Sequence, residues 1–174
     1  MSSSSSREDL FDFATMGGYQ GVTPEEKSVA MPENAIFALV SGDPDFFCVK
    51  EGDVYVVNKQ ERGHFAAPRF ASNHIEDVEK HLAFMLGNSV RTRSGLPRIW
   101  LPSFSLAYGC EAGRFRVEGS PADVTLSWVE RDQVHVASAM SEDRAEEFVQ
   151  YGTYSVQEIV QSFQRIDGAP LFRK

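Results

Sequence analysis

The sequence predicts a single α+β domain in which an antiparallel sheet of hairpins packs against one long helix, with further helices at the N- and C-terminal ends. Strand-like segments fall into two groups, one on each side of the longest helical pattern, and short turns rich in Gly, Pro and Asp separate neighbouring segments. No internal repeat or domain-scale linker interrupts the chain. With 174 residues, of which 42% are hydrophobic, it is long enough to bury one continuous core.

The first expected element is a helix from Ser6 to the pair Gly17–Gly18. Ser6 can cap its start, acidic residues follow in the first turn where the helix dipole favours them, and the glycines end it. Its apolar face would consist of Leu10, Phe13 and Ala14, together with Phe11. Residues 1–6 contain a serine run without the basic and apolar regions of a signal peptide. We therefore expect a flexible leader at 1–6 and the domain at 7–174.

Three consecutive strands are expected next, at 35–42 (AIFALVSG), 45–52 (DFFCVKEG) and 53–63 (DVYVVNKQERG). They are rich in Val, Ile, Phe and Tyr, and the turns between them contain Gly, Asp and Pro. A further strand is expected at 64–72, with Pro68 placing it at an edge or a bend. These segments predict antiparallel hairpins.

The strongest helical pattern runs from Ile75 to Val90, with apolar residues at helical spacing and acidic residues in the first turns. Ser72 or Asn73 can cap its start, and the helix should cover one face of the sheet. The basic cluster RTRSG at 91–95 follows. We interpret it as cations that complement the dipole of the helix C-terminus, with an anion site as the alternative.

The second group of strands is expected at 114–119, 122–130 and 132–140. Val124, Leu126 and Trp128 alternate with polar residues, which indicates one buried face. His135 should lie on the face opposite its neighbouring valines, either exposed or hydrogen-bonded.

Two short helices should close the chain, capped by Ser141 and Ser155 in the capping-box pattern. Gly168 then ends the second helix, and residues 169–172 can fold apolar side chains back to close the core.

Sequence motifs for catalysis or cofactor binding are missing. The histidines are scattered, the acidic pairs are typical of solvated surface, and neither nucleotide-binding glycine patterns nor a nucleophile elbow occurs. We therefore expect no enzymatic activity, no metal and no cofactor. The net charge of −8 argues against nucleic acid or a membrane surface as partners and favours a basic protein. Two cysteines without a motif are typical of reduced thiols in the cytoplasm.

Three stretches carry a resemblance to a known family: "FATMGGY", "VEKHLAFMLGNSVRTRSGLPRI" and "YSVQEIVQSFQRIDGAPLF". Together with the hairpins, they resemble a family of bacterial immunity proteins that includes the immunity factor for the tuberculosis necrotizing toxin, whose toxin domain is an NAD glycohydrolase. The resemblance implies a cytoplasmic antitoxin that binds a toxin domain stoichiometrically and blocks its substrate cleft without catalysis of its own.

The candidate contact residues follow from physical reasoning. A cleft that binds an anionic dinucleotide is expected to be basic, so an acidic or polar loop would compete with substrate there. The turns at 41–45 and 58–65 would supply Asp43, Asp45, Glu61 and Arg62; the alternative is that they are ordinary solvated turns. Trp100, next to a proline turn, is the aromatic residue that we expect to be partly exposed and to anchor a partner.

Two other functions stay open on the sequence. One is a non-catalytic adaptor or secretion chaperone, which would bind a partner that has no toxic activity. The other is a small hydrolase or transferase that uses a carboxylate with a dispersed histidine such as His64 or His135.

Overall fold

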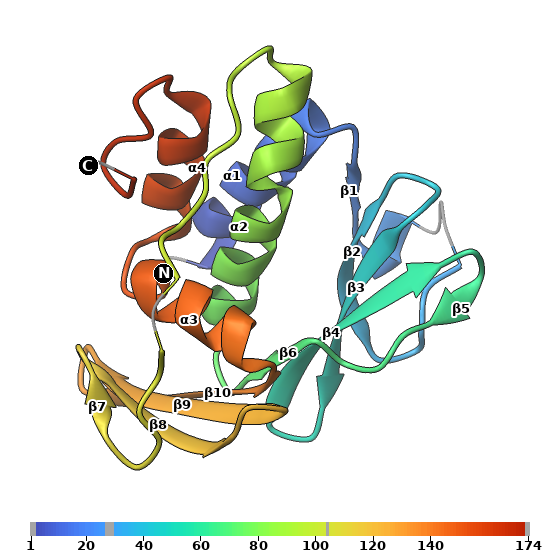
Figure 1. Ribbon diagram of the computed structural model, residues 1–174. Coiled ribbons are helices and arrows are strands. Elements are labelled where there is room, and N and C mark those ends of the chain that lie inside the picture. Colours follow the sequence, from blue (N-terminus) through green and yellow to red (C-terminus); the bar gives the residue numbers. More distant parts are fainter. Residues whose placement is uncertain (1–2, 27–29, 104, 173–174) are drawn as a thin grey trace.

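The protein forms a single α+β domain, as predicted. The computed structural model describes residues 3–26, 30–103 and 105–172. One antiparallel sheet of ten strands runs in the order β1-β2-β3-β4-β6-β10-β9-β8-β7, with β5 paired to β4, and helices line its inner side (Figure 1). None of the described helices combines the length and hydrophobicity needed to cross a membrane.

The sheet consists of two sets of hairpins joined by one short strand. The first set is β1 (Gln20–Val22), β2 (Ala35–Val40), β3 (Asp45–Glu51), β4 (Val54–Glu61) and β5 (His64–Phe65). The second is β7 (Glu111–Ala112), β8 (Phe115–Ser120), β9 (Asp123–Glu130) and β10 (Gln133–Met140). Strand β6 (Phe70–Ser72) pairs with β4 on one side and with β10 on the other. This three-residue strand alone makes the sheet continuous.

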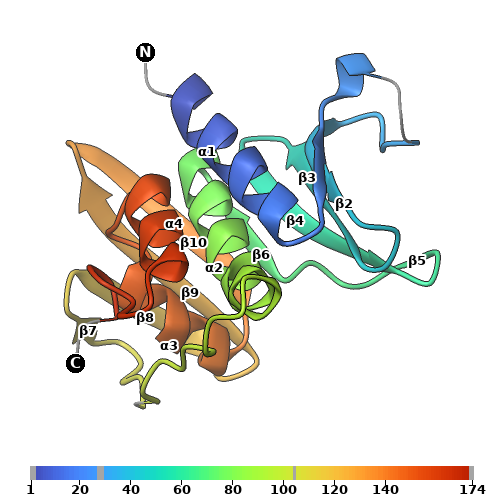
Figure 2. The same cartoon turned by 90° about the horizontal axis from the view of Figure 1, so that it is seen from above.

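Three helices form a layer on the inner side of the sheet, and a fourth lies on the second set of hairpins. Helix α2 (Ile75–Arg93) packs between α1 (Ser3–Met16) and α4 (Val156–Gln164), and α3 (Glu142–Tyr151) contacts β9 and β10 (Figure 2). A one-turn 3-10 helix, Pro24–Glu26, follows β1. The prediction of one long helix against the sheet is therefore too simple, because α1 and α4 share that layer.

The close approach of α4 to α2 requires a glycine. A Cβ added to Gly87 would lie 2.3 Å from the ring of Phe163, a distance that real side chains essentially never adopt. Phe163 in turn packs on Phe172 of the tail, with ring centroids 4.8 Å apart. The tail does fold back onto the core, as predicted.

Helix α1 begins earlier than expected. It starts at Ser3, so residues 3–6, which we placed in a flexible leader, are helical. Ser6 does not cap the helix; its Oγ donates to Glu79 Oε2 at 2.6 Å, and Arg7 Nε pairs with Glu79 Oε1 at 3.0 Å. Glu79 on α2 is fully buried, and burial raises the pKa of its carboxyl. These contacts tie α1 to α2.

Other element boundaries also differ from expectation. The predicted strand 64–72 divides into β5 and β6, with Pro68 in the segment between them. The N-cap of α2 is His74, not Ser72 or Asn73. The Ser72 hydroxyl donates to Asp77, and the Asn73 side chain bonds the backbone of β10. Ser155 and Glu158 form the predicted capping box, whereas the Ser141 side chain makes no capping hydrogen bond.

Candidate partner-binding surfaces

Four of the five candidate contact residues lie together at one edge of the first set of hairpins. Pairing of β3 with β4 places Asp45 opposite Gln60, and the Arg62 backbone N–H donates to Asp43 Oδ1 at 3.2 Å. Asp43, Asp45, Glu61 and Arg62 are therefore neighbours on two adjacent turns. We call residues 41–45 and 58–65 the hairpin rim.

The hairpin rim carries mixed charge, and its aspartates hold its backbone. Asp45 Oδ1 accepts from the N–H groups of Ser41 and Gly42 at 2.8 and 2.9 Å. Lys59 forms an ion pair with Glu61, and this hydrogen bond holds the pKa of the Glu61 carboxyl below its ordinary value. Lys59 and Arg62 thus offset much of the acidic charge that we expected on these turns.

Trp100 lies in a different part of the molecule. It belongs to the segment that follows α2, drawn in yellow-green, and both views place this segment far from β5 and the hairpin rim (Figures 1 and 2). Its side chain is 75% exposed, so the expected exposure is confirmed. The Arg98 guanidinium carbon lies 5.5 Å from the centroid of the Trp100 ring, within the range of a cation–π contact.

Three side chains hold the backbone on both sides of Trp100. Asn88 Nδ2 donates to the carbonyl of Ile99 at 2.9 Å, and its Oδ1 accepts from the Ile99 N–H at 2.9 Å. Arg91 Nε donates to the carbonyl of Pro97, and Gln150 Nε2 donates to that of Pro102 at 3.1 Å. We call residues 97–102 the Trp100 segment. Its backbone is fastened to α2 and α3.

A hollow of about 810 Å³ separates the Trp100 segment from the C-terminal tail. Its apolar lining comes mainly from Trp100, Leu101, Ile166, Leu171 and Phe172. Ile166 is 76% exposed. Two large apolar side chains from distant parts of the sequence therefore stand exposed around one hollow, and none of the described residues that line it is a histidine or a cysteine.

Arg91 connects the two sides of this hollow. Besides Pro97, its guanidinium donates to the carbonyls of Phe163, Arg165 and Ile166 at 3.0, 2.6 and 3.3 Å. The side chain is almost fully buried. Arg91 lies in the last turn of α2, where we expected cations, and in addition it satisfies carbonyls at the C-terminal end of α4, a role that the sequence did not predict.

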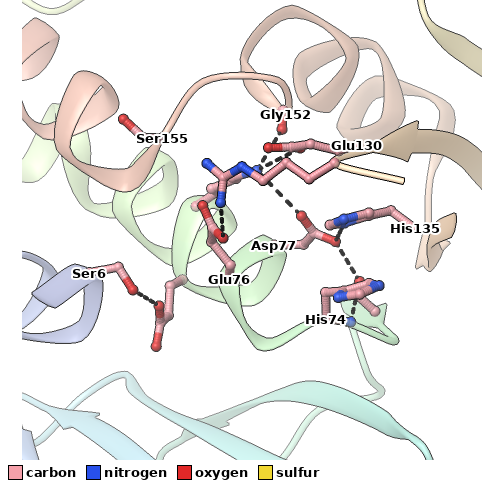
Figure 3. A network of polar contacts seen from close by, with 12 residues as sticks. Ser6, His74, Glu76, Asp77, Glu130, His135, Gly152 and Ser155 are labelled. Carbon is pink, nitrogen blue, oxygen red and sulfur yellow. Dashed lines mark hydrogen bonds and ion pairs between the residues drawn. The ribbon is translucent and has the colours of Figure 1, made fainter. Parts of the chain in front are cut away.

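A second group of polar residues is buried where the two sets of hairpins meet (Figure 3). Asp77 Oδ2 accepts from Ser72 Oγ at 2.8 Å and lies 2.9 Å from His135 Nδ1. Lys80 Nζ lies 3.5 Å from Asp77 Oδ1 and 3.4 Å from Glu130 Oε2. Lys80 also donates to the carbonyl of Gly152 at 3.1 Å. We call this group the Asp77 cluster.

The Asp77 cluster contains a serine, a histidine and an aspartate but lacks the arrangement of a hydrolase. A nucleophilic serine needs a base that takes its proton, whereas here both the serine and the histidine contact the same carboxylate. His135 is 5% exposed, Ser72 1% and Asp77 0%, so no substrate reaches them. His135 occupies the hydrogen-bonded strand position that was one of its two expected environments.

Two further titratable side chains, His81 and Cys48, are also buried. Burial, with a smaller contribution from Arg144, lowers the pKa of His81 to about 3, and its Nδ1 lies 3.0 Å from the Tyr151 hydroxyl. Burial raises the pKa of the Cys48 thiol to about 12, so this cysteine is an inert thiol. Within the ranges that the structure describes, no group of His, Cys, Asp and Glu is placed to hold a metal ion.

Comparison with known proteins decides the family. The model of the family described as Immunity protein 61 matches residues 15–171, which is nearly the whole chain. The chain belongs to this family. The resemblance to bacterial immunity proteins is thereby confirmed.

A solved structure similar to this immunity protein supports the fold. Rv3902c from M. tuberculosis superimposes with a TM-score of 0.74 at 24% sequence identity, over 95% of this chain and 92% of that one. No curated protein sequence matches the chain. Both the hairpin rim and the Trp100 segment lie inside the part of this immunity protein that the family model matches.

Sequence reasoning missed Ile166 and the residues that hold the Trp100 segment. Ile166 stands alone between charged residues and has no periodic pattern around it. Asn88, Arg91 and Gln150 act through contacts between segments that are far apart in the chain. A pattern of neighbouring residues in the sequence does not reveal contacts between distant segments.

Proposed function

We propose that this chain neutralises a toxin by binding the toxin domain one to one in the cytoplasm and blocking its substrate cleft, without catalysis of its own. The match to an immunity protein family over residues 15–171 carries this proposal. We propose an NAD glycohydrolase as the toxin, on the basis of the resemblance given above.

The character of the surface supports a binding role. Asp77, Lys80 and His135 are buried and inaccessible to substrate, as are His81 and Cys48, while large apolar side chains such as Trp100 stand exposed. The net charge of −8 would speed association with a toxin whose cleft is basic. We propose that Asp43, Asp45, Glu61, Arg62 and Trp100 supply contacts to the toxin.

The alternatives give different predictions. A non-catalytic adaptor or secretion chaperone would bind a protein that has no toxic activity. A hydrolase would need an accessible base, and of its two named histidines His135 is buried whereas His64 is exposed on β5. Loss of turnover on replacement of His64 would favour that function.

The decisive experiment is a titration. NAD consumption by the purified toxin domain encoded beside the gene for this chain is measured while this protein is added in increasing molar ratio. We expect activity to fall linearly and to reach its minimum near one equivalent. A toxin that consumes NAD and is unaffected by several equivalents would contradict the proposal. A neighbouring toxin with another activity, inhibited in the same stoichiometry, would keep the immunity function and replace only the substrate.

A further inference from the structure

We propose that Trp100, together with Ile166, is the principal anchor for the toxin, and that it enters an apolar pocket on the toxin with an acidic side chain at its edge. This inference rests on the proposed function and specifies which of the candidate residues dominates. It predicts that the hairpin rim contributes less to affinity than the Trp100 segment.

Trp100 combines an exposed side chain with a backbone segment that is held by hydrogen bonds. The indole is 75% exposed, and yet Asn88, Arg91 and Gln150 each commit a side chain to the carbonyls or N–H groups around it. A rigidly presented aromatic side chain loses little conformational entropy on binding, and Trp is enriched among the residues that dominate interfaces.

Ile166 adds a second exposed apolar side chain near Trp100. Ile166 is as exposed as Trp100 and lines the same hollow, and the buried Arg91 guanidinium holds the backbone on both sides. The backbone segments that carry the two side chains are thus held relative to each other. Exposed apolar groups gathered around a preformed hollow are typical of a protein-binding site rather than of scattered surface residues.

Arg98, next to Trp100, indicates the chemistry of the partner. Arg98 lies over the Trp100 ring, and none of the ion pairs between described residues involves it. A pocket that buries the indole would also cover this guanidinium, and a buried cation requires an anionic partner. The complementary surface is therefore an apolar pocket flanked by a carboxylate.

The hairpin rim lacks these properties. Its aspartates are already engaged with backbone N–H groups of the turns, and its Glu61 is paired with Lys59. Charged groups at an exposed rim affect association rates more than final affinity. The rim is better suited to steering the encounter than to anchoring the complex.

The first test measures the affinity of single variants for the same purified toxin domain. We expect Trp100→Ala to raise Kd by about 30-fold or more and Ile166→Ala by about fivefold or more, as for dominant and secondary interface residues. The matched control is Val134→Ala, because Val134 is 60% exposed on the outer face of β10, outside the hollow. Its Kd should stay within about twofold of the wild type.

Outcomes of this test separate the inference from the proposed function. A Trp100→Ala variant that binds and inhibits like the wild type, with an Asp43→Ala/Asp45→Ala/Glu61→Ala variant that does not, would overturn the inference and leave the immunity function intact. A wild-type chain that neither binds nor inhibits the toxin would overturn the proposed function and this inference with it. Thermal unfolding of each variant identifies any change caused by misfolding.

A second measurement follows Trp100 itself in the wild-type protein. The protein has two tryptophans, of which Trp100 is exposed and Trp128 is buried. In protein labelled with fluorotryptophan, the 19F signal of Trp100 should shift on addition of unlabelled toxin while that of Trp128 stays in place. A Trp100→Phe variant assigns the two signals. An unchanged Trp100 signal in a saturated complex would contradict the inference.

Asn88 tests whether the held backbone matters. It is a positioning residue, because its side chain bonds both the N–H and the carbonyl of Ile99. Asn88→Ala should weaken toxin binding by about fivefold or more through loss of preorganisation and should sharpen the 19F signal of Trp100 in the free protein, as expected for a more mobile ring. Full affinity with an unchanged signal would show that the anchor does not depend on this support.

Discussion

The Asp77 cluster and the hairpin rim contain similar side chains but differ in burial. In the cluster, Asp77 and Lys80 are fully buried and join α2 to β6 and to β9 and β10 of the second set of hairpins. In the rim, the carboxylates and basic groups are partly or fully exposed and bond mostly within two adjacent turns. Ion pairs and hydrogen bonds between the same kinds of side chain thus stabilise the fold where water is excluded, and are available for partner recognition where water has access.

The largest effect on stability is expected from Asp77→Ala. Removal of this carboxylate leaves the buried His135 without its acidic partner, Lys80 with Glu130 alone, and Ser72 without its acceptor. The free energy of unfolding should fall by about 3–5 kcal/mol, measured by urea denaturation at neutral pH. A loss below about 1 kcal/mol would show that water or neighbouring groups replace the carboxylate.

A pH dependence should follow from His81. Its pKa is about 3 in the folded protein and about 6.5 in an unfolded chain. The unfolded state therefore binds the extra proton, and the contribution of His81 to stability is complete above about pH 6.5 and lost as the pH falls toward 3. The wild type should lose about 2 kcal/mol more than His81→Gln between about pH 7.5 and pH 5.

Glutamine is chosen at position 81 because it keeps a polar side chain near Tyr151 and does not titrate. Subtracting the stability of His81→Gln from that of the wild type at each pH cancels the contribution of the carboxyl groups that titrate in both proteins. Equal slopes of stability against pH for the two proteins would contradict a neutral, buried His81.

A smaller effect is expected at the start of α4. Ser155→Ala removes the hydrogen bond from the Glu158 N–H to the serine side chain and should cost about 1 kcal/mol. Ser141→Ala is the matched control, because Ser141 occupies the same position at α3 without a capping bond from its side chain. Equal losses in the two variants, compared by chemical denaturation, would argue against the capping box.

The smallest effect on stability is expected at the hairpin rim. Asp43 is exposed and accepts one hydrogen bond, from the Arg62 N–H, so Asp43→Ala should change the free energy of unfolding by no more than about 0.5 kcal/mol. Its effect should appear instead in the rate of toxin association, as a slower on-rate at low salt that approaches the wild-type value at high salt. Stopped-flow binding at two ionic strengths checks this.

Elements with local signals were predictable from sequence, and elements that depend on tertiary contacts were not. The periodicity of Val124, Leu126 and Trp128 indicates the strand β9, and Ser155 with Glu158 marks the start of α4. Strand β1 is three residues long and exists through pairing with β2, so its sequence carries little pattern. At α3 the serine is followed three residues later by Arg144, which pairs with Glu147 and is unable to complete a capping box.

The candidate sites show the same limit. The grouping of Asp43 with Arg62 follows from hairpin pairing and could be anticipated, and so could the exposure of Trp100 beside its prolines. The contact of Asp77 with His135 joins residues 58 positions apart, and Ile166 lies beside Trp100 only because the tail folds back. Long-range contacts of this kind have no signature in a single sequence.

The short strand β6 also bears on how the chain folds. Each set of hairpins closes through turns of a few residues, whereas β6 meets β10 by pairing Ala71 with Ser138. The chain between Ala71 and Ser138 forms a long loop. The entropy lost on closing this loop must be overcome before the pairing contributes favourable contacts. We expect the hairpins to form early and the junction between them to form late, so that substitutions at Ala71 or Asp77 would accelerate unfolding and leave the folding rate nearly unchanged.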